Sequence, residues 1–132
     1  MQQKIEASLE KQGLMQTLGA NITLVEEGKV IIECPFKEGL SQQNGYFHAG
    51  VMTSIVDSAC GYAALTMMPP NAEVLTVEFK VNFLRGMKTE KVIAIGQVLK
   101  AGRTLTVCEG KVYEATGQKI LANMTATMIC MQ

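Results

Sequence analysis

The chain has 132 residues and a mass of 14.3 kDa, with 12 Lys and Arg balanced by 12 Asp and Glu. A net charge of zero argues against a nucleic-acid binder or a polybasic membrane-surface protein, because both need a sustained excess of Lys and Arg. The 48% hydrophobic content excludes general disorder. The length fits one domain, residues 1–132, with its own core.

The first third of the chain predicts a helix and a hairpin. Residues 4–11 carry Ile5 and Leu9 between charged side chains, which indicates a short amphipathic helix. Residues 21–26 and 29–36 are extended runs separated by two residues, an arrangement typical of a β-hairpin.

The longest apolar segment covers residues 49–68 and ends at Pro69. Its large apolar side chains follow helical spacing, and most of the remaining positions are small, so we expect a helix buried nearly all round. Asp57, several hydroxyl side chains and the lack of flanking Lys or Arg argue against a membrane span.

The remaining residues predict four strands, at 74–84, 91–100, 104–114 and 119–131. The complete order of elements predicts an α+β fold: an antiparallel sheet of about six strands wrapped around one long helix, with a short N-terminal helix. In the first of these strands, alternation places five apolar side chains on one face: Leu75, Val77, Phe79, Val81 and Phe83.

The cysteines and the single histidine are too far apart for a metal or redox motif. We therefore expect no metal site. Thiols in apolar surroundings usually behave as small buried side chains, which suits a cytoplasmic protein. The four are Cys34, Cys60, Cys108 and Cys130.

Asp57 is the only charged residue between Glu38 and Glu73. A carboxylate inside an apolar helix is costly unless it has a partner or a function. It is a candidate general base or nucleophile. The alternative is a structural carboxylate that accepts hydrogen bonds or faces solvent.

His48 stands where the long helix is expected to begin. The unpaired N–H groups of a helix N-terminus favour a developing oxyanion, so the amides of Ala49 and Gly50 are candidates for binding one. The alternative is that His48 only caps the helix. Nine residues separate His48 from Asp57, which is roughly 13 Å along a helix and on opposite faces. If both residues act on one substrate, the site must be built from two chains.

Residues 42–50, followed by Asp57 in a helix of small residues, resemble the signature of hotdog-fold acyl-CoA thioesterases of the phenylacetate-pathway (PaaI-like) type. The likeness extends over residues 75–79, 99–104 and 122–128, and so covers nearly the whole chain.

This resemblance implies a role for each matching residue. Asp57 falls on the carboxylate that attacks the thioester or activates water, and Ala49 on the residue whose N–H polarises the carbonyl. Gln42 falls on a contact to the carbonyl or the water, Thr76 on a hydroxyl that helps to orient water, and His48 on a loop-positioning residue.

The sequence departs from the family pattern at Ala49, and it offers two candidates, Gln42 and Asn44, for one contact. Ala49 stands where His-Gly-Gly members of the family have their first Gly, although an alanine retains the N–H. Asn44 is closer in sequence to His48 than Gln42 is and rivals it as the carbonyl or water contact.

Charge suggests where coenzyme A would bind. Residues 80–132 carry eight Lys and Arg against three Glu, a net charge of +5, so residues 1–79 carry −5. Basic turns suit phosphates, and we predict contacts from Lys100 and Arg103, with Arg85 a further candidate. Solvated edge-strand lysines would explain most of these charges equally well.

The resemblance thus implies a cytoplasmic hydrolase of small-to-medium or aromatic acyl-CoA thioesters, with no separate cofactor. The geometry requires at least a homodimer, and relatives are commonly tetramers built as dimers of dimers. One alternative is a hotdog dehydratase or hydratase, although the Asp-x-Asn-Pro-x-His motif of such enzymes is absent. The other is a non-catalytic acyl-CoA-binding module, against which the Asp57 carboxylate argues.

Overall fold

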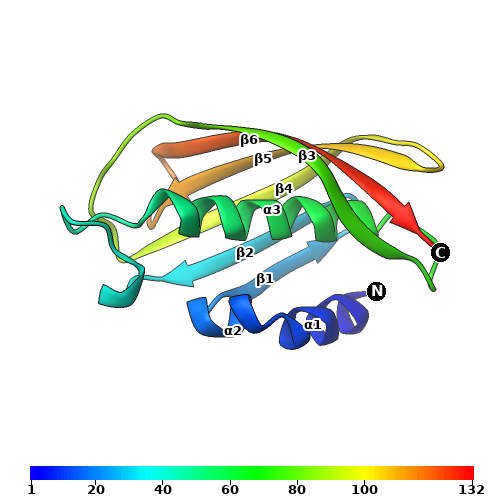
Figure 1. Cartoon of the computed structure of the whole chain (residues 1–132), viewed down its shortest axis with the longest axis horizontal. Helices are drawn as coiled ribbons and strands as arrows, with labels where there is room; N and C mark the ends of the chain where they lie inside the picture. The colour runs from blue at the N-terminus through cyan, green and yellow to red at the C-terminus, as the bar shows by residue number, and fades with distance from the viewer.

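The computed structural model describes residues 1–132 and shows one long helix lying across a curved sheet (Figure 1). The sheet has six antiparallel strands in the order β1-β2-β4-β5-β6-β3, which confirms the predicted α+β architecture. None of the helices combines the length and apolar character needed to cross a membrane. The elements are α1 (Gln2–Lys11), α2 (Gly13–Leu18), β1 (Asn21–Glu26), β2 (Lys29–Pro35), a 3-10 turn (Glu38–Leu40), α3 (Ala49–Leu65), β3 (Glu73–Phe83), β4 (Lys91–Ala101), β5 (Leu105–Glu114) and β6 (Ile120–Met131).

Helix α3 packs directly against two glycines in the middle of the sheet. Gly96 of β4 and Gly110 of β5 are cross-strand partners directly beneath it. A Cβ atom on Gly96 would overlap the backbone of Ala59, and one on Gly110 would lie 2.5 Å from Val56 Cγ2. Glycine at both positions therefore fixes the distance between α3 and the sheet.

The N-terminal part contains a second helix that the sequence does not predict. In α2, Met15 and Leu18 are buried, and the helix ends at Gly19 in the left-handed region with φ +75°. Six residues are too few to show a helical period. Both α1 and α2 lie along the β1 side of the sheet (Figure 1).

Helix α3 ends at Leu65, three residues before the predicted end at residue 68. The Thr66 hydroxyl donates to the Ala63 carbonyl and accepts the Gly28 N–H, and so ties this end to the β1–β2 turn. Pro69 also disfavours helical backbone in the residue before it.

Strand β3 contains a bulge that makes one prediction wrong. The pairing with β6 shifts between Thr76 and Glu78, so Val77 is an extra residue. Thr76 pairs with Met128 on the face toward α3, and Leu75 lies on the other face. Strict alternation therefore fails: Leu75 does not share a face with Phe79, whereas Thr76 does.

Candidate active site

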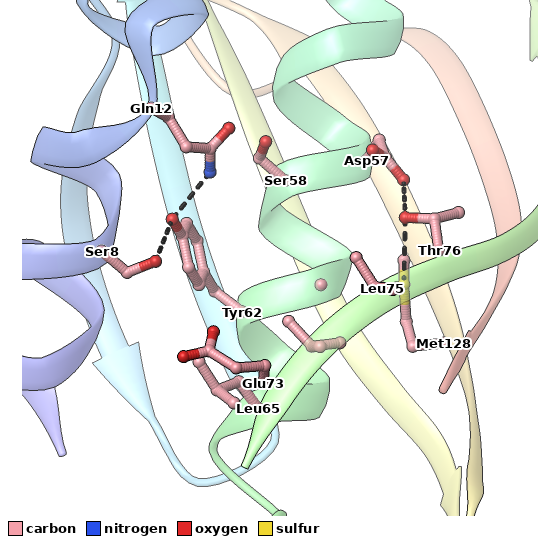
Figure 2. Close-up of a pocket in the computed structure, with 12 residues that line it drawn as sticks. Ser8, Gln12, Asp57, Ser58, Tyr62, Leu65, Glu73, Leu75, Thr76 and Met128 are labelled. Atoms are coloured by element: carbon pink, nitrogen blue, oxygen red, sulfur yellow. Dashed lines mark hydrogen bonds between the residues drawn. The ribbon is translucent and has the colours of Figure 1, made fainter. Parts of the chain in front are cut away.

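Asp57 lies in the middle of α3 and is half-buried. Its Oδ1 accepts a hydrogen bond from Thr76 Oγ1 at 2.8 Å, across the bulge in β3 (Figure 2). Burial raises the pKa of the Asp57 carboxyl above its ordinary value, and the Thr76 hydrogen bond partly opposes this rise. A partly desolvated carboxylate held by one hydroxyl can act as a base or a nucleophile.

A cavity of about 290 Å³ adjoins Asp57. One stripe of α3 forms its floor, the start of β3 covers it, and α1 with the residue that follows it closes one side (Figure 2). Gly61 lies in the middle of the floor and leaves room that a side chain would occupy. The lining residues are Ser8, Gln12, Asp57, Ser58, Gly61, Tyr62, Leu65, Glu73, Val74, Leu75, Thr76 and Met128.

A second cavity, of about 490 Å³, lies at the N-terminal end of α3. It brings together the predicted residues Gln42, His48 and Ala49, which face the segment that follows β3. The two cavities have no lining residue in common. Other residues around the second cavity are Tyr46, Phe47, Met52, Phe83, Leu84, Arg85 and Gly86.

The start of α3 offers one free amide, not two. His48 Nδ1 accepts the Gly50 N–H at 2.8 Å, so His48 is the N-cap of the helix. The Gly50 N–H is thus engaged by the cap, and its role in binding an oxyanion stays a prediction. The Ala49 N–H makes no hydrogen bond within the chain and remains available.

Gln42 holds its own loop and lines the second cavity. Its Oε1 accepts the N–H groups of Asn44 at 2.6 Å and Tyr46 at 3.2 Å, whereas its Nε2 has no partner in the chain. Asn44 is exposed and does not line this cavity. The geometry thus favours Gln42 over Asn44 as a donor near the Ala49 amide.

The comparisons with known proteins agree with this geometry. Residues 44–121, more than half of the chain, match the family model described as the thioesterase superfamily. The chain belongs to the thioesterase superfamily. This membership confirms the predicted hotdog fold and the predicted class of thioester hydrolase.

Solved structures and a curated relative support the same assignment. The thioesterase is 44% identical to a thioesterase family protein from Silicibacter pomeroyi, with a TM-score of 0.93 and coverage of 98% of this chain and 96% of that one. It shares its fold with the Escherichia coli PaaI protein, at 19% identity, TM-score 0.89 and coverage of 98% and 92%. It is 28% identical over 116 residues to the 1,4-dihydroxy-2-naphthoyl-CoA hydrolase of Listeria monocytogenes, covering 88% of this chain and 94% of that one.

Of the three predicted coenzyme A contacts of this thioesterase, one lines a cavity and two do not. Lys100 and Arg103 are exposed at the β4–β5 turn and line neither cavity, so their role stays a prediction. Arg85 does line the cavity at His48. In the whole chain, no three His, Cys, Asp or Glu side chains gather as a possible metal site.

Sequence reasoning missed the part of the Asp57 cavity that α1 contributes. Ser8 lies in α1 and Gln12 directly follows the end of this helix, four residues later, and both contact Tyr62. That spacing could have been noticed, but nothing in the sequence shows that α1 packs beside the last turns of α3.

Proposed function

We propose that two copies of the chain pair along the free edge of β3 and complete each other's active site. Strand β3 is the last in the sheet, bonded only to β6, and its Phe79 and Phe83 are 40% and 47% exposed. A long, exposed apolar edge is prone to pair with another strand. A second copy of β3 would cover it.

Pairing β3 with its own copy about a two-fold axis has a direct consequence for the site. The first residues of β3 line the Asp57 cavity, and Phe83 at its end lines the cavity at His48. In an antiparallel pair, the start of one strand lies beside the end of the other. The Asp57 cavity of one chain thus adjoins the Gln42 and Ala49 donors of its partner.

The proposed reaction is the hydrolysis of an acyl-CoA thioester. The Asp57 carboxylate either attacks the carbonyl carbon or accepts the proton of the water that attacks it. The Ala49 N–H and Gln42 Nε2 of the other chain stabilise the oxyanion. The C–S bond then breaks, and the coenzyme A thiolate leaves and takes up a proton. If water attacked, this step gives the free acid directly. If Asp57 attacked, water then hydrolyses the anhydride bond between the acyl group and Asp57, which releases the acid and restores the carboxylate. Neither a metal nor a separate cofactor takes part.

The size of the cavity supports a small-to-medium or aromatic acyl group. An apolar cavity of about 150 Å³ can hold benzene, so 290 Å³ beside Asp57 suits an acyl group of about one substituted ring. The Listeria monocytogenes relative is named for an aromatic acyl-CoA.

We further propose that the protein is a cytoplasmic dimer of dimers, and that Lys100 and Arg103 lie near the coenzyme A phosphates.

The single observation that carries this proposal is the half-buried Asp57 held by Thr76 beside a cavity. The test is thiol release from acetyl-, hexanoyl-, palmitoyl-, phenylacetyl- and benzoyl-CoA by the wild type and by Asp57→Asn. We expect hydrolysis of the short and ring-sized thioesters and a loss of about 10²–10⁴-fold in the variant. Glu26→Gln, an exposed carboxylate on β1, is the matched control and should retain full activity.

Three results would overturn the proposal. These are no cleavage of any thioester, Asp57→Asn as fast as the wild type, and tight acyl-CoA binding without turnover. The last result would instead support the non-catalytic binding module. Hydration or dehydration of an enoyl- or hydroxyacyl-CoA without thiol release would support the dehydratase alternative.

A further inference from the structure

Met128 places a sulfur atom next to the hydroxyl that holds Asp57. It lies on β6, is fully buried, and is the direct cross-strand partner of Thr76. Its Sδ accepts a hydrogen bond from Thr76 Oγ1 at 3.4 Å. Figure 2 shows the Thr76 hydroxyl between this sulfur and the Asp57 carboxylate, with a hydrogen bond drawn to each. Thr76 therefore has two acceptors on opposite sides of its hydroxyl.

The Thr76 hydroxyl has only one proton to share between these acceptors. While Asp57 is ionised, the carboxylate takes that proton, because hydrogen bonds to charged acceptors are about twice as strong as neutral ones and a thioether is a weak acceptor. The distances agree with this order, at 2.8 Å to Asp57 and 3.4 Å to Met128. The sulfur can become the better acceptor only when Asp57 loses its charge.

Both forms of the proposed reaction remove the charge of Asp57. The carboxylate gains a proton if it activates water, and it gains a covalent bond to the acyl group if it attacks the thioester. Thr76 can then turn its proton toward the Met128 sulfur. The lone pairs of its oxygen become free to accept a hydrogen bond from the protonated carboxyl or from water. The Thr76 proton stays on its own oxygen throughout, and no covalent bond forms to the sulfur.

The surroundings of Asp57 leave Thr76 as its hydrogen-bond partner in the chain. Burial is the main cause of the raised pKa of Asp57, and the Thr76 hydrogen bond is the opposing one. Glu73 of β3 and Tyr62 of α3 are the other titratable groups that line the cavity, to which α1 and β6 contribute none. Burial, assisted by nearby charges that include Asp57, raises the pKa of the Cys60 thiol on α3 and keeps it protonated.

We propose that Met128 is a positioning residue that acts through Thr76, its sulfur accepting the Thr76 hydroxyl proton whenever Asp57 is uncharged. Thr76 thus donates to the ionised carboxylate and accepts from the protonated carboxyl or from water. This inference rests on the proposed thioesterase function and adds a residue to its mechanism. Leucine at position 128 would fill nearly the same volume without a sulfur, which separates this role from packing.

The experiment follows the protonation of Asp57 by NMR titration of its isotope-labelled carboxyl carbon, assigned with Asp57→Asn. Removing the sulfur disfavours the protonated form and leaves the ionised form as it is, so Met128→Leu should lower the pKa of Asp57. The titration midpoint and the acidic limb of kcat/KM should move to lower pH by roughly 0.3–1 pH unit. For phenylacetyl-CoA, kcat should fall roughly 2- to 12-fold. KM should stay the same, because the sulfur acts only after Asp57 loses its charge.

Two comparisons separate this role from a structural one. Met124 is buried on the same face of β6 but does not line the cavity, so Met124→Leu is the matched control and should leave the titration unchanged. In the Thr76→Val background, Met128→Leu should cause no further shift, because the hydroxyl that links the sulfur to Asp57 is gone. Met128→Ile, which also lacks sulfur, serves as a second variant if the leucine side chain disturbs folding.

Three results would overturn the inference and leave the proposed hydrolysis intact. These are a midpoint that Met128→Leu leaves unchanged or raises, an equal shift in Met124→Leu, and a full shift in the Thr76→Val background. Failure of the proposed function would appear differently, as no turnover of any thioester by the wild type. The NMR titrations need no substrate, so in that case they would still show whether the sulfur takes up the Thr76 proton.

Discussion

Replacing Gly61 with alanine should stabilise the protein and impair its activity at once. A Cβ at this position would have Val74 Cγ1 as its nearest neighbour, at 4.0 Å, which is ordinary van der Waals contact. Glycine in a helix interior costs about 1 kcal/mol relative to alanine. Gly61→Ala should therefore raise the free energy of unfolding by about 1 kcal/mol and Tm by roughly 4 °C.

The same methyl group enters the cavity beside Asp57, because both Gly61 and Val74 line it. Overfilling a packed site costs about 1–3 kcal/mol, so kcat/KM for phenylacetyl-CoA should fall roughly 5- to 150-fold. Acetyl-CoA, which does not reach past Gly61, should be cleaved as before. Gly13→Ala in α2, with nothing within 4 Å of the added atom, is the control and should leave both substrates unaffected.

Thermal unfolding and steady-state kinetics on both thioesters check this prediction. An equal loss for acetyl- and phenylacetyl-CoA, or no loss for either, would show that acyl groups do not occupy this cavity. A fall in Tm would show that the helix cannot accommodate the methyl group.

Three further changes follow from the structure. Gly96→Ala should lower the free energy of unfolding by at least about 1–3 kcal/mol, because its Cβ would overlap the Ala59 backbone; unaltered denaturant midpoints would contradict this. Hydrogen bonds from the Thr116 hydroxyl and nearby backbone N–H groups lower the pKa of Glu114 to about 2. The stabilisation that the ionised Glu114 carboxylate provides should be complete above about pH 4.5 and disappear as the pH falls toward 2. In urea titrations, the free energy of unfolding of Glu114→Gln should therefore be lower than that of the wild type near neutral pH, and the two values should converge in acid. Thr76→Val removes the hydrogen bond that lowers the pKa of Asp57, so the acidic limb of the profile of kcat/KM against pH should move to higher pH. Thr76→Ser, which keeps the hydroxyl, should return the limb to its wild-type position. An unchanged profile in Thr76→Val would refute the effect of this hydroxyl on Asp57.

Much of the fold could be predicted because hydrophobic patterns determine it. In β6, the alternate side chains of Ala122, Met124, Ala126 and Met128 are all buried, the pattern expected of a strand with one face in the core. The uniformly apolar α3 was likewise recognisable as a core helix. The errors lie where the pattern is too short or is interrupted, as in the six residues of α2 and at the bulge in β3.

The bulge shows why local patterns could not define the site. Alternation alone puts Thr76 on the face opposite Phe79, away from α3. One extra residue, Val77, turns Thr76 toward Asp57. The resemblance to thioesterases identified Thr76 as functional, but only the register with β6 explains how its hydroxyl reaches the carboxylate.

Two other features of the site could not be predicted from the sequence, because they depend on contacts in the folded chain. These are the state of the Gly50 amide at the start of α3 and the side of the Asp57 cavity that Ser8 and Gln12 form. Whether the Gly50 amide is free depends on the His48 rotamer, and His48 uses it as a cap. The contact of Ser8 and Gln12 with Tyr62 joins residues about fifty positions apart, which no local pattern encodes.

The central claim is that each active site takes Asp57 from one chain and Gln42 from another. Asp57→Asn and Gln42→Ala should each be nearly inactive alone. After unfolding and refolding equal amounts together, random pairing gives about one quarter of the sites a wild-type Asp57 and Gln42. We therefore predict recovery of about one quarter of wild-type acyl-CoA hydrolysis. Mixed oligomers demonstrated by native mass spectrometry but no more active than the single variants would contradict the shared site.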